Sequence, residues 1–374
     1  MKKVKLGELL IYEQPTKYLV NSDFYNNNYK TPVLTAGKSF LLGYSNEKEN
    51  IFDDIPVIIF DDFTTASQYV DFPFKVKSSA MKILHCNYEK TDIRYIFHQL
   101  QRINIDTRRH KRYWISEFAN LEIPLPPLPQ QKAIAAQLDK AQELIQYNEQ
   151  LIEKYDELQQ SLFLDMFGDP VINEKGWEKA TITNLVTKSQ HSIKRGPFGG
   201  ALKKEIFVDD GYLVYEQYHA LNKDFSMMRY FITDEKFEEL KAFEVKPGDI
   251  IISCSGVYLG KLAIIPKNAR KGIINQALLK ITLDNEIMRN DFFVFHFSNS
   301  NFKNKYFKAN RGAGIPNFPP MTEFRKFPFI LPPLDLQNDF AQKIESVEIQ
   351  KEQAKEALAK SKDIFQGLLQ EHFF

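Results

Sequence analysis

The 374-residue chain has little cysteine: its two thiols, Cys86 and Cys254, lie far apart in the sequence. Such a pair provides neither a disulfide framework nor a zinc cluster and favours a reduced, cytoplasmic protein. No stretch approaches the roughly 18 consecutive apolar residues of a membrane span, and the N-terminus lacks the apolar core of a signal peptide. The sequence therefore predicts a soluble protein with no membrane partner.

Catalytic and metal-binding patterns are also missing. The seven histidines show no metal-ligand spacing. The glycine loops at Arg195–Gly200, Ser255–Lys261 and Arg311–Pro316 match neither the P-loop nor the dinucleotide-binding spacing. The segment Asn317–Pro320 has the letters of the adenine-methyltransferase tetrapeptide in the wrong order, without the final aromatic that stacks on a flipped base. We expect no catalysis by this chain alone, no bound cofactor and no metal.

Two pairs of acids, Asp53-Asp54 and Asp61-Asp62, flank the apolar segment Ile55–Phe60. A nuclease needs carboxylates that converge on a divalent metal. Adjacent residues of a strand point to opposite faces, so turn or polar roles are favoured. A metal-dependent nuclease remains an alternative, which metal-dependent cleavage abolished by Asp61→Ala would support.

A long helix is predicted after a cluster of prolines in residues 123–170. About 35 residues without Gly or Pro carry apolar or small residues at alternating steps of four and three, which is a heptad seam. A helix of roughly 32 residues is about 48 Å long. Residues 329–374 repeat the design. The predicted seam positions include Leu138, Ile145, Asn148, Ile152, Tyr155 and Leu162 in the first helix, and Ile344, Val347, Leu358, Phe365 and Leu368 in the second. Asn148 either fixes the register of paired helices or faces water.

The chain is an internal repeat. Leu125–Leu128 aligns with Leu331–Leu334 at an offset of 206 residues, which also places Gln131 on Gln337. The globular segments that precede the two helices show the same order of elements, with insertions in loops. The fold class is α+β, with globular parts at 1–122 and 171–328 and long helical regions at 123–170 and 329–374. Predicted strands are Thr31–Gly37, Ile55–Phe60 and Ala80–Leu84, then Gly211–Tyr215, Pro247–Ser253 and Ala277–Ile281. Val4–Ile11 and Ala180–Val186 are opening elements, helix or strand, and the helices are Thr91–Arg102 and Asp291–Asn301.

Charge separates by segment. The formal net charges of 1–122, 123–170, 171–328 and 329–374 are +2, −5, +7 and −3. Basic globular parts joined by acidic helices suit a polyanion held by the former. The plain alternative is that exposed helix faces simply favour glutamate.

Basic and aromatic residues cluster on loops of both globular parts. Arg and Lys neutralise phosphates and can bond guanine edges, and Gly lets the backbone approach DNA closely. The predicted nucleic-acid contacts are Lys38, Tyr44, Thr64, Thr65, Lys75, Lys77, Arg108, Arg109, Lys111, Arg112, Lys194, Arg195, Phe198, Lys203, Lys204, Ser255, Tyr258, Lys261, Lys308 and Arg311.

The motifs together resemble the specificity subunit of type I restriction-modification enzymes, over the whole chain. The matching motifs are Leu125–Gln131, Leu331–Leu334, Gly196–Gly199 with Leu202-Lys203, Pro247–Ile250 with Ser253–Gly256 and Gly260-Lys261, Asn275–Leu278, and Thr31–Lys38 with Gly43-Tyr44. The first globular part lacks the Gly-Pro-Phe-Gly and Ser-Gly loops, so contacts cannot be transferred between the halves.

The resemblance implies two target-recognition domains that read different half-sites of double-stranded DNA, and two helical regions that pair antiparallel as a spacer. It also implies two modification (methyltransferase) subunits carrying S-adenosylmethionine for adenine N6 methylation, and restriction (translocase) subunits using ATP and Mg²⁺. The alternative from another class is a coiled-coil scaffold whose globular domains bind protein. Loss of duplex binding would favour that scaffold.

Overall fold

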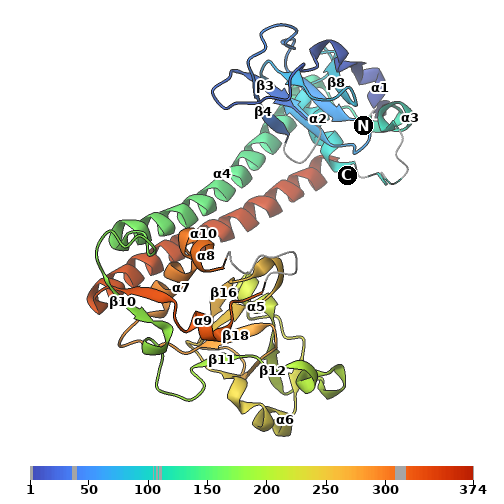
Figure 1. Ribbon diagram of the computed structural model, residues 1–374. Helices are drawn as coiled ribbons and strands as arrows, with labels where there is room; N and C mark the ends of the chain where they lie inside the picture. The colour runs from blue at the N-terminus through green and yellow to red at the C-terminus, as the bar shows by residue number, and fades with distance from the viewer. Residues whose placement is uncertain are drawn as a thin grey trace. The chain divides into compact units, whose positions relative to one another are not determined.

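The computed structural model describes residues 3–35, 40–103, 105–106, 108, 112–307 and 317–373. The chain forms two compact units, Met1–Gln150 with Ala354–Phe374, and Leu151–Gln353. Each unit holds a globular part and a stretch of each of two long helices (Figure 1). Within the described residues, no helix combines the length and the apolar character that crossing a membrane requires.

The first unit follows the predicted α+β order. Its elements are β1 (Lys3–Lys5), α1 (Leu6–Leu9), β2 (Leu10–Glu13), η1 (Pro15–Tyr18), β3 (Thr31–Leu34), β4 (Leu41–Ser45), β5 (Val57–Asp61), β6 (Ser67–Val70), β7 (Lys75–Val76), β8 (Met81–Cys86), α2 (Ile93–Arg102), α3 (Tyr113–Ser116), η2 (Phe118–Asn120), β9 (Glu122–Pro124) and the beginning of α4 (Leu128–Phe167). The opening segment, predicted as helix or strand, contains both.

Two sheets form the core of the first unit. The antiparallel sheet has the order β2-β8-β5-β6, and a smaller sheet has the order β4-β3-β7 with β3 and β7 parallel. Because side chains alternate along a strand, Ile58 and Phe60 pack toward α2 and α4 while Val57 and Ile59 face the smaller sheet. Strand β5 is therefore buried on both faces.

The second unit repeats this architecture. Its elements are β10 (Glu178–Thr181), η3 (Ile182–Asn184), β11 (Ile193–Arg195), η4 (Gly199–Leu202), η5 (Lys204–Ile206), β12 (Tyr212–Tyr215), α5 (Gln217–Asn222), β13 (Phe231–Ile232), α6 (Asp234–Glu239), η6 (Lys241–Phe243), β14 (Glu244–Val245), β15 (Ile250–Ser253), η7 (Gly256–Tyr258), β16 (Leu262–Ile264), β17 (Gly272–Ile274), β18 (Leu278–Ile281), α7 (Asn290–Ser298), α8 (Ser300–Phe307), α9 (Met321–Phe324), β19 (Pro328–Leu331) and the beginning of α10 (Leu334–Phe373).

Strand pairing confirms that one fold is used twice. The sheet β11-β18-β15-β16 corresponds to β2-β8-β5-β6, and the parallel pair β12/β17 corresponds to β3/β7. In each half a short antiparallel pair, β1/β9 or β10/β19, joins the start of the globular part to the strand before the proline motif. These pairs bring each long helix to the base of its own globular part.

The long helices extend beyond the predicted seam. Each has 40 residues, and α4 begins at Leu128, within the proline cluster. Helix α4 ends at Phe167, and the next residue, Gly168, has a φ of +75° and donates from its N–H to Leu164 O at 2.7 Å. This left-handed glycine is a common way for a helix to end. The indole of Trp177 donates to Phe167 O at 2.8 Å and so satisfies one of the final carbonyls.

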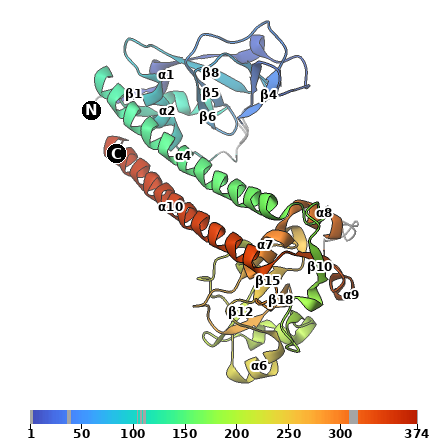
Figure 2. The ribbon, with the colours of Figure 1, turned by 90° about the vertical axis from the view of Figure 1, so that its left-hand side faces the viewer.

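Helices α4 and α10 pair in both units. In the first unit, the beginning of α4 lies against the end of α10, and in the second unit the end of α4 lies against the beginning of α10. The pairing is therefore antiparallel, and both views show the helices side by side (Figures 1 and 2). The expectation of two long paired helices is confirmed.

One local prediction was wrong. The helix predicted over Asp291–Asn301 is two helices, because Asn299 leaves the helical conformation and its Oδ1 caps α8 by accepting from Asn301 N at 2.9 Å. Helix α10 begins at Leu334, and Pro333 O accepts backbone hydrogen bonds from Leu336 N and Gln337 N. Asp335 lies in the first turn, where its charge still suits the helix dipole.

Candidate nucleic-acid interface

Several sequence motifs of the second globular part meet at one end of its sheets. Asn275 donates from its N–H to Tyr215 O at 2.9 Å, and Cys254 N donates to Ala277 O at 2.8 Å. Gly196 fits tightly beside them, because a Cβ at this position would lie 1.8 Å from Asn275 O. The close approach requires glycine. The segments around Gly196, Tyr215, Cys254 and Asn275 thus form one cluster, which we call the loop cluster.

Gln217 joins two of these loops, and sequence reasoning missed it. Its Nε2 donates to Ser253 Oγ at 2.8 Å and to Ser255 O at 3.0 Å. These bonds hold the segment that follows β15 against the start of α5. No spacing signal marks Gln217 in the sequence, because its role depends on contacts between segments almost 40 residues apart.

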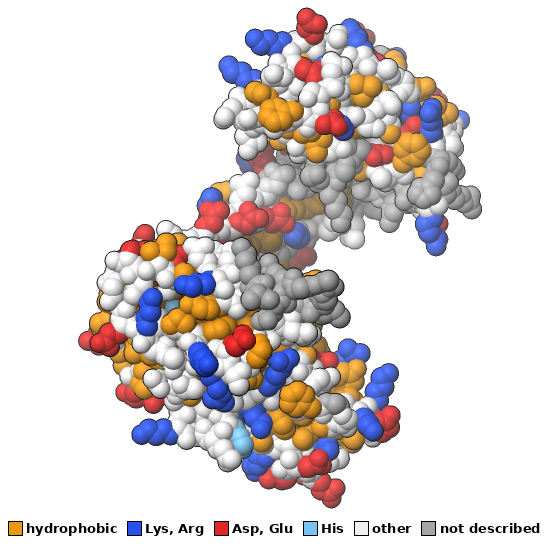
Figure 3. All heavy atoms as spheres, in the orientation of Figure 1, with side chains coloured by type: hydrophobic (Ala, Val, Ile, Leu, Met, Phe, Trp, Pro, Cys, Tyr) orange, Lys and Arg blue, Asp and Glu red, His pale blue; other side chains and the backbone are white. Residues whose placement is uncertain are grey.

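Large apolar side chains project from the loop cluster into solvent. Phe198 is 83% exposed, Val257 is 87% exposed and Tyr258 is 53% exposed. On the face drawn in Figure 3, lysine and arginine side chains of the second unit stand among apolar ones. Exposed aromatic rings can stack on nucleotides, and neighbouring cations can neutralise phosphates.

The predicted basic residues of the second unit differ in exposure. Lys203, Lys204 and Lys261 are exposed, whereas Lys194 and Arg195 are half-buried. Lys194 Nζ lies 4.9 Å from the centroid of the Phe243 ring, which is within range of a cation–π contact. Ser255, also half-buried, is the loop residue held by Gln217.

The predicted contact residues of the first unit are more scattered. Thr64 and Arg112 are exposed, and Tyr44 and Thr65 are half-buried. Lys77 and Arg108 are exposed, and each already has an acidic partner: Lys77 pairs with Asp23, and Arg108 pairs with Asp106. Five predicted contact residues lie outside the described residues: Lys38, Arg109 and Lys111 of the first globular part, and Lys308 and Arg311 of the second.

Lys75 does not face solvent. It is 1% exposed, and its Nζ lies 3.0 Å from Glu47 Oε2 and donates to Glu49 O at 2.9 Å. Strand β7 pairs in parallel with β3, and the Lys75 side chain is buried together with Glu47. The lysine also helps to lower the pKa of Glu47 against the opposing effect of desolvation. Lys75 is a structural ion-pair residue, and we remove it from the predicted contact surface.

The acids Asp61 and Asp62 have structural roles. Asp61 Oδ1 accepts from Phe63 N and Thr64 N at 2.7 and 3.0 Å, which builds the turn after β5. Asp62 Oδ1 accepts from Trp114 N at 2.8 Å, and its Oδ2 lies 3.2 Å from Lys82 Nζ. Among the described residues no group of three or more His, Cys, Asp or Glu side chains is placed to hold a metal ion.

Both cysteines are buried, and burial raises the pKa of each thiol to about 12. For Cys254 the nearby Arg195 guanidinium opposes this rise without cancelling it. The thiolate is the form that attacks electrophiles and binds metals. Neither side chain is therefore suited to nucleophilic or metal chemistry at neutral pH.

The predicted seam residues of the two long helices differ in burial. Leu138, Ile145, Asn148 and Ile344 are buried; Ile152, Tyr155, Leu162, Val347, Leu358, Phe365 and Leu368 are half-buried. Asn148 Nδ2 donates to Leu144 O at 2.8 Å and lies 3.3 Å from Ser361 Oγ on the partner helix. Asn148 is therefore buried against the partner helix and does not face water, and its role in fixing the register stays a prediction.

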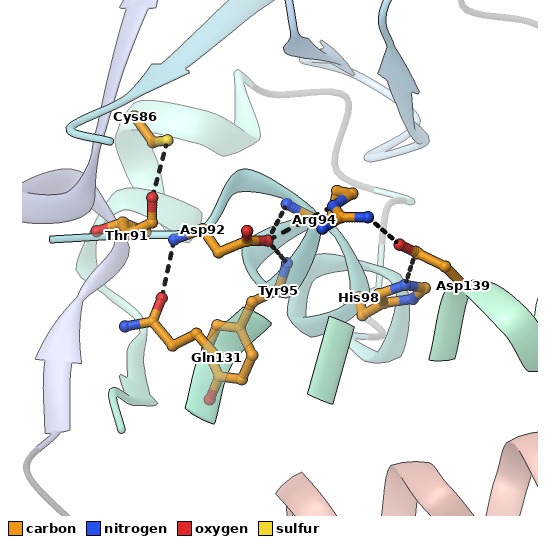
Figure 4. A network of polar contacts seen from close by, with 8 residues as sticks. All are labelled: Cys86, Thr91, Asp92, Arg94, Tyr95, His98, Gln131 and Asp139. Atoms are coloured by element: carbon orange, nitrogen blue, oxygen red, sulfur yellow. Dashed lines mark hydrogen bonds and ion pairs between the residues drawn. The ribbon is translucent and has the colours of Figure 1, made fainter. Parts of the chain in front are cut away.

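A polar network fixes the first globular part to its long helix (Figure 4). Buried His98 on α2 lies 2.7 Å, Nε2 to Oδ1, from Asp139 on α4, and Arg94 contacts the other oxygen of Asp139 at 2.9 Å. Asp92 caps α2 by accepting from Arg94 N and Tyr95 N. Its own N–H donates to Gln131 Oε1 at 2.9 Å. These bonds set the orientation of α2 on α4.

Comparisons with known proteins agree with this architecture. The family model for the type I restriction modification DNA specificity domain matches residues 1–155 and 174–360. The Escherichia coli type I restriction enzyme EcoR124I/EcoR124II specificity subunit is 49% identical over 138 residues, which are 35% of this chain and 34% of that subunit. The Methanocaldococcus jannaschii type I restriction enzyme MjaVIII specificity subunit is 23% identical over 98% of this chain and 91% of that protein.

Solved structures share the fold. The S subunit of a type I restriction-modification system from M. genitalium superposes with a TM-score of 0.62 at 15% identity, covering all of this chain and 96% of that one. A chain from a study of complex assembly and conformational transition of the type I R-M system gives 0.56 at 15% identity, covering 99% and 96%. The specificity subunits of this family are non-catalytic. With its duplicated domain, paired helices and matching motifs, the chain belongs to the type I restriction-modification DNA specificity family.

Proposed function

We propose that this chain reads a bipartite DNA target, with one target-recognition domain for each half-site. The domains are residues 1–122 and 171–328, and the spacer regions are 123–170 and 329–374. The proposal is supported by two globular parts that share strand order and carry different loops. One fold with two sets of loops suits two different half-sites on one duplex.

The loop cluster is the observation that carries the proposal. It combines exposed Phe198 and Tyr258 with exposed Lys203 and Lys261 on backbone held by glycines and by Gln217. Side chains of these types can contact bases and phosphates when they are presented on a fixed backbone. The corresponding turn of the first domain is built on Asp61 and carries Thr64, so the two domains offer different groups.

The chemistry is assigned to partner subunits. Two modification subunits carrying S-adenosylmethionine would methylate adenine N6, and restriction subunits using ATP and Mg²⁺ would translocate and cleave DNA. The internal repeat gives this chain two equivalent halves, which suits two identical modification subunits. The paired helices would set the unread gap between the half-sites.

Exposed apolar residues on the long helices are the proposed docking surface for the modification subunits. Leu144 and Tyr147 are 47% and 63% exposed, and Leu158 and Leu164 are both 43% exposed. Charging the first pair (Leu144→Asp with Tyr147→Asp) should abolish co-purification of a modification subunit, while Leu144→Met with Tyr147→Phe should preserve it. Undiminished binding by the charged variant would contradict this assignment.

Mapping N6-methyladenine in cells that carry this chain with its modification subunit tests the proposal as a whole. Exchanging residues 171–328 for those of another specificity subunit should change one half of the methylated motif. Changing the length of the paired helices should change only the gap. A methylated motif that stays the same after the domain exchange would refute the assignment of recognition to this domain.

A further inference from the structure

Lys303, on α8, is a lysine in an apolar setting. Its side chain is half-buried beside Gly260 and the rings of Phe297 and Phe307. A Cβ placed on Gly260 would lie 3.7 Å from Lys303 Cε and within 3.8 Å of both rings. The two ring centroids are themselves 5.5 Å apart. The end of the Lys303 stem and the two rings therefore converge around Gly260, in surroundings that an apolar side chain would suit.

The Lys303 ammonium has no countercharge among the described residues. Its side chain makes no hydrogen bond or ion pair there, and the nearby cation of Lys261 is likewise without an acidic partner. The pKa of Lys303 is lowered to about 8, mainly by burial and to a smaller extent by the positive charge of Lys261. Keeping two cations close together without an anion costs free energy. A bound anion between the two lysines in the functional complex would offset this cost.

The position of Lys303 and Lys261 in the fold indicates which kind of anion they bind. Lys261 follows directly on the loop that carries Tyr258, and Gly260 N donates to Ser253 O at 2.9 Å. Ser253 is also the residue whose Oγ accepts from Gln217 in the loop cluster. The two lysines thus border the surface that we assign to DNA, at the end of the β15–β16 loop.

We infer that Lys303 and Lys261 together bind one backbone phosphate of the DNA. This inference rests on the proposed function and adds a residue, Lys303, that the sequence motifs do not contain. A phosphate provides the missing negative charge and accepts hydrogen bonds from both ammonium groups. Gly260, beside the Lys303 stem, has a φ of +75° and so lets the loop turn before Lys261.

The test uses the full chain and a mixed-sequence duplex of about 30 base pairs, titrated between about 50 and 200 mM salt. Each phosphate contact contributes about 0.9 to the slope of log affinity against log salt concentration. Lys303→Met and Lys261→Met should each reduce the steepness of that slope by up to about 0.9 and weaken binding several-fold. Lys236→Met is the control, because Lys236 Nζ already pairs with Glu239 at 2.7 Å, and its slope should equal that of the wild type.

Thermal unfolding gives a second readout. Lys303→Met should unfold at the same temperature as the wild type or higher, because methionine fills the apolar site without a charge. Lys303→Arg keeps the charge and should retain the wild-type salt slope. A lower unfolding temperature for Lys303→Met with an unchanged slope would mark Lys303 as a packing residue and overturn the inference.

The remaining outcomes separate this inference from the proposed function. A wild-type chain that does not bind the duplex would refute the proposed function. Steep salt dependence in the wild type that persists in Lys303→Met and Lys261→Met would overturn only the phosphate site. Inorganic phosphate that raises the unfolding temperature of the wild type but not of Lys303→Met, with an unchanged duplex slope, would assign the pair to a free anion and also overturn the inference.

Discussion

Gln131 and Gln337 make the same set of hydrogen bonds in the two halves of the chain. Oε1 of Gln131 accepts from Asp92 N, and Oε1 of Gln337 accepts from Arg289 N, both at 2.9 Å. Their Nε2 groups donate to Pro126 O and Pro332 O at 2.8 and 2.9 Å. Each glutamine therefore ties the start of a domain helix to the proline motif before a long helix.

Removing either glutamine should destabilise the chain. Gln131→Ala leaves the Asp92 N–H and two carbonyls without these partners at a site that is 1% exposed. We expect the free energy of unfolding, measured with denaturant, to fall by about 1–3 kcal/mol. Gln130→Ala, at the neighbouring exposed position, should change it by less than about 0.5 kcal/mol. Equal losses in the two variants would show that the hydrogen bonds are unimportant.

Replacing Asn148 with an acidic residue should lower the stability of the folded chain. Its Nδ2 donates to Leu144 O and lies near Ser361 Oγ, and Asn148→Asp would place a carboxylate against that carbonyl in a buried seam. Because the buried charge is unfavourable, the pKa of the new carboxyl should rise above its unfolded value. The loss of stability should be greatest at neutral pH and shrink toward pH 4, as the carboxyl protonates.

Gln146→Glu is the matched control for Asn148→Asp, because it makes the same amide-to-acid change at an exposed position two residues earlier. Denaturant unfolding at several pH values compares the two variants. If both lose stability to the same extent and with the same pH dependence, the seam is not the cause.

The ion pair of Asp62 and Lys82 should contribute strongly to folding. Both side chains are less than 5% exposed, and Asp62→Ala leaves the Lys82 ammonium buried without its carboxylate. We expect a loss of about 3–5 kcal/mol in the free energy of unfolding, partly recovered when Lys82→Met is added. Asp53→Ala changes an exposed acid that lies before the same strand, β5, and should have little effect. A double variant no more stable than Asp62→Ala would contradict this account.

The repeat, the long helices and the order of strands could be predicted from the sequence because each is a pattern along the chain. The heptad seam indicated the paired helices, and the aligned proline motifs placed Gln131 on Gln337. Contacts made across the fold left no such pattern. Lys75 resembles any other loop lysine until the pairing of β7 with β3 places it beside Glu47.

The same limit explains what was missed in the candidate site. Gln217 and Lys303 lie outside the motifs, and each becomes significant only through neighbours distant in sequence, Ser253 for the first and Gly260 for the second. The predicted helix over Asp291–Asn301 is interrupted because the Asn299 side chain caps the helix that follows. A periodic pattern of apolar residues does not show that a polar residue inside the pattern will act as a cap.

His296 should make the second unit sensitive to acid. It is fully buried on α7, its Nε2 accepts from Ile330 N at 3.2 Å, and burial lowers its pKa to about 3. The unfolded chain, with a histidine pKa of about 6.5, binds a proton that the folded chain excludes between these values. The contribution of His296 to the free energy of unfolding is therefore constant above about pH 6.5 and decreases as the pH falls toward 3.

His296→Gln retains an acceptor for the Ile330 N–H but cannot titrate. Between about pH 6.5 and 5 the wild type should lose up to about 1.4 kcal/mol per pH unit through His296, and the variant should lack this contribution. His191→Gln makes the same substitution at a half-buried position of the second unit and is the control. Denaturant unfolding followed across this range measures the three slopes. If the slope of His296→Gln equals that of the wild type, the folded protein accommodates a charged His296, and its burial does not govern the acid sensitivity of the second unit.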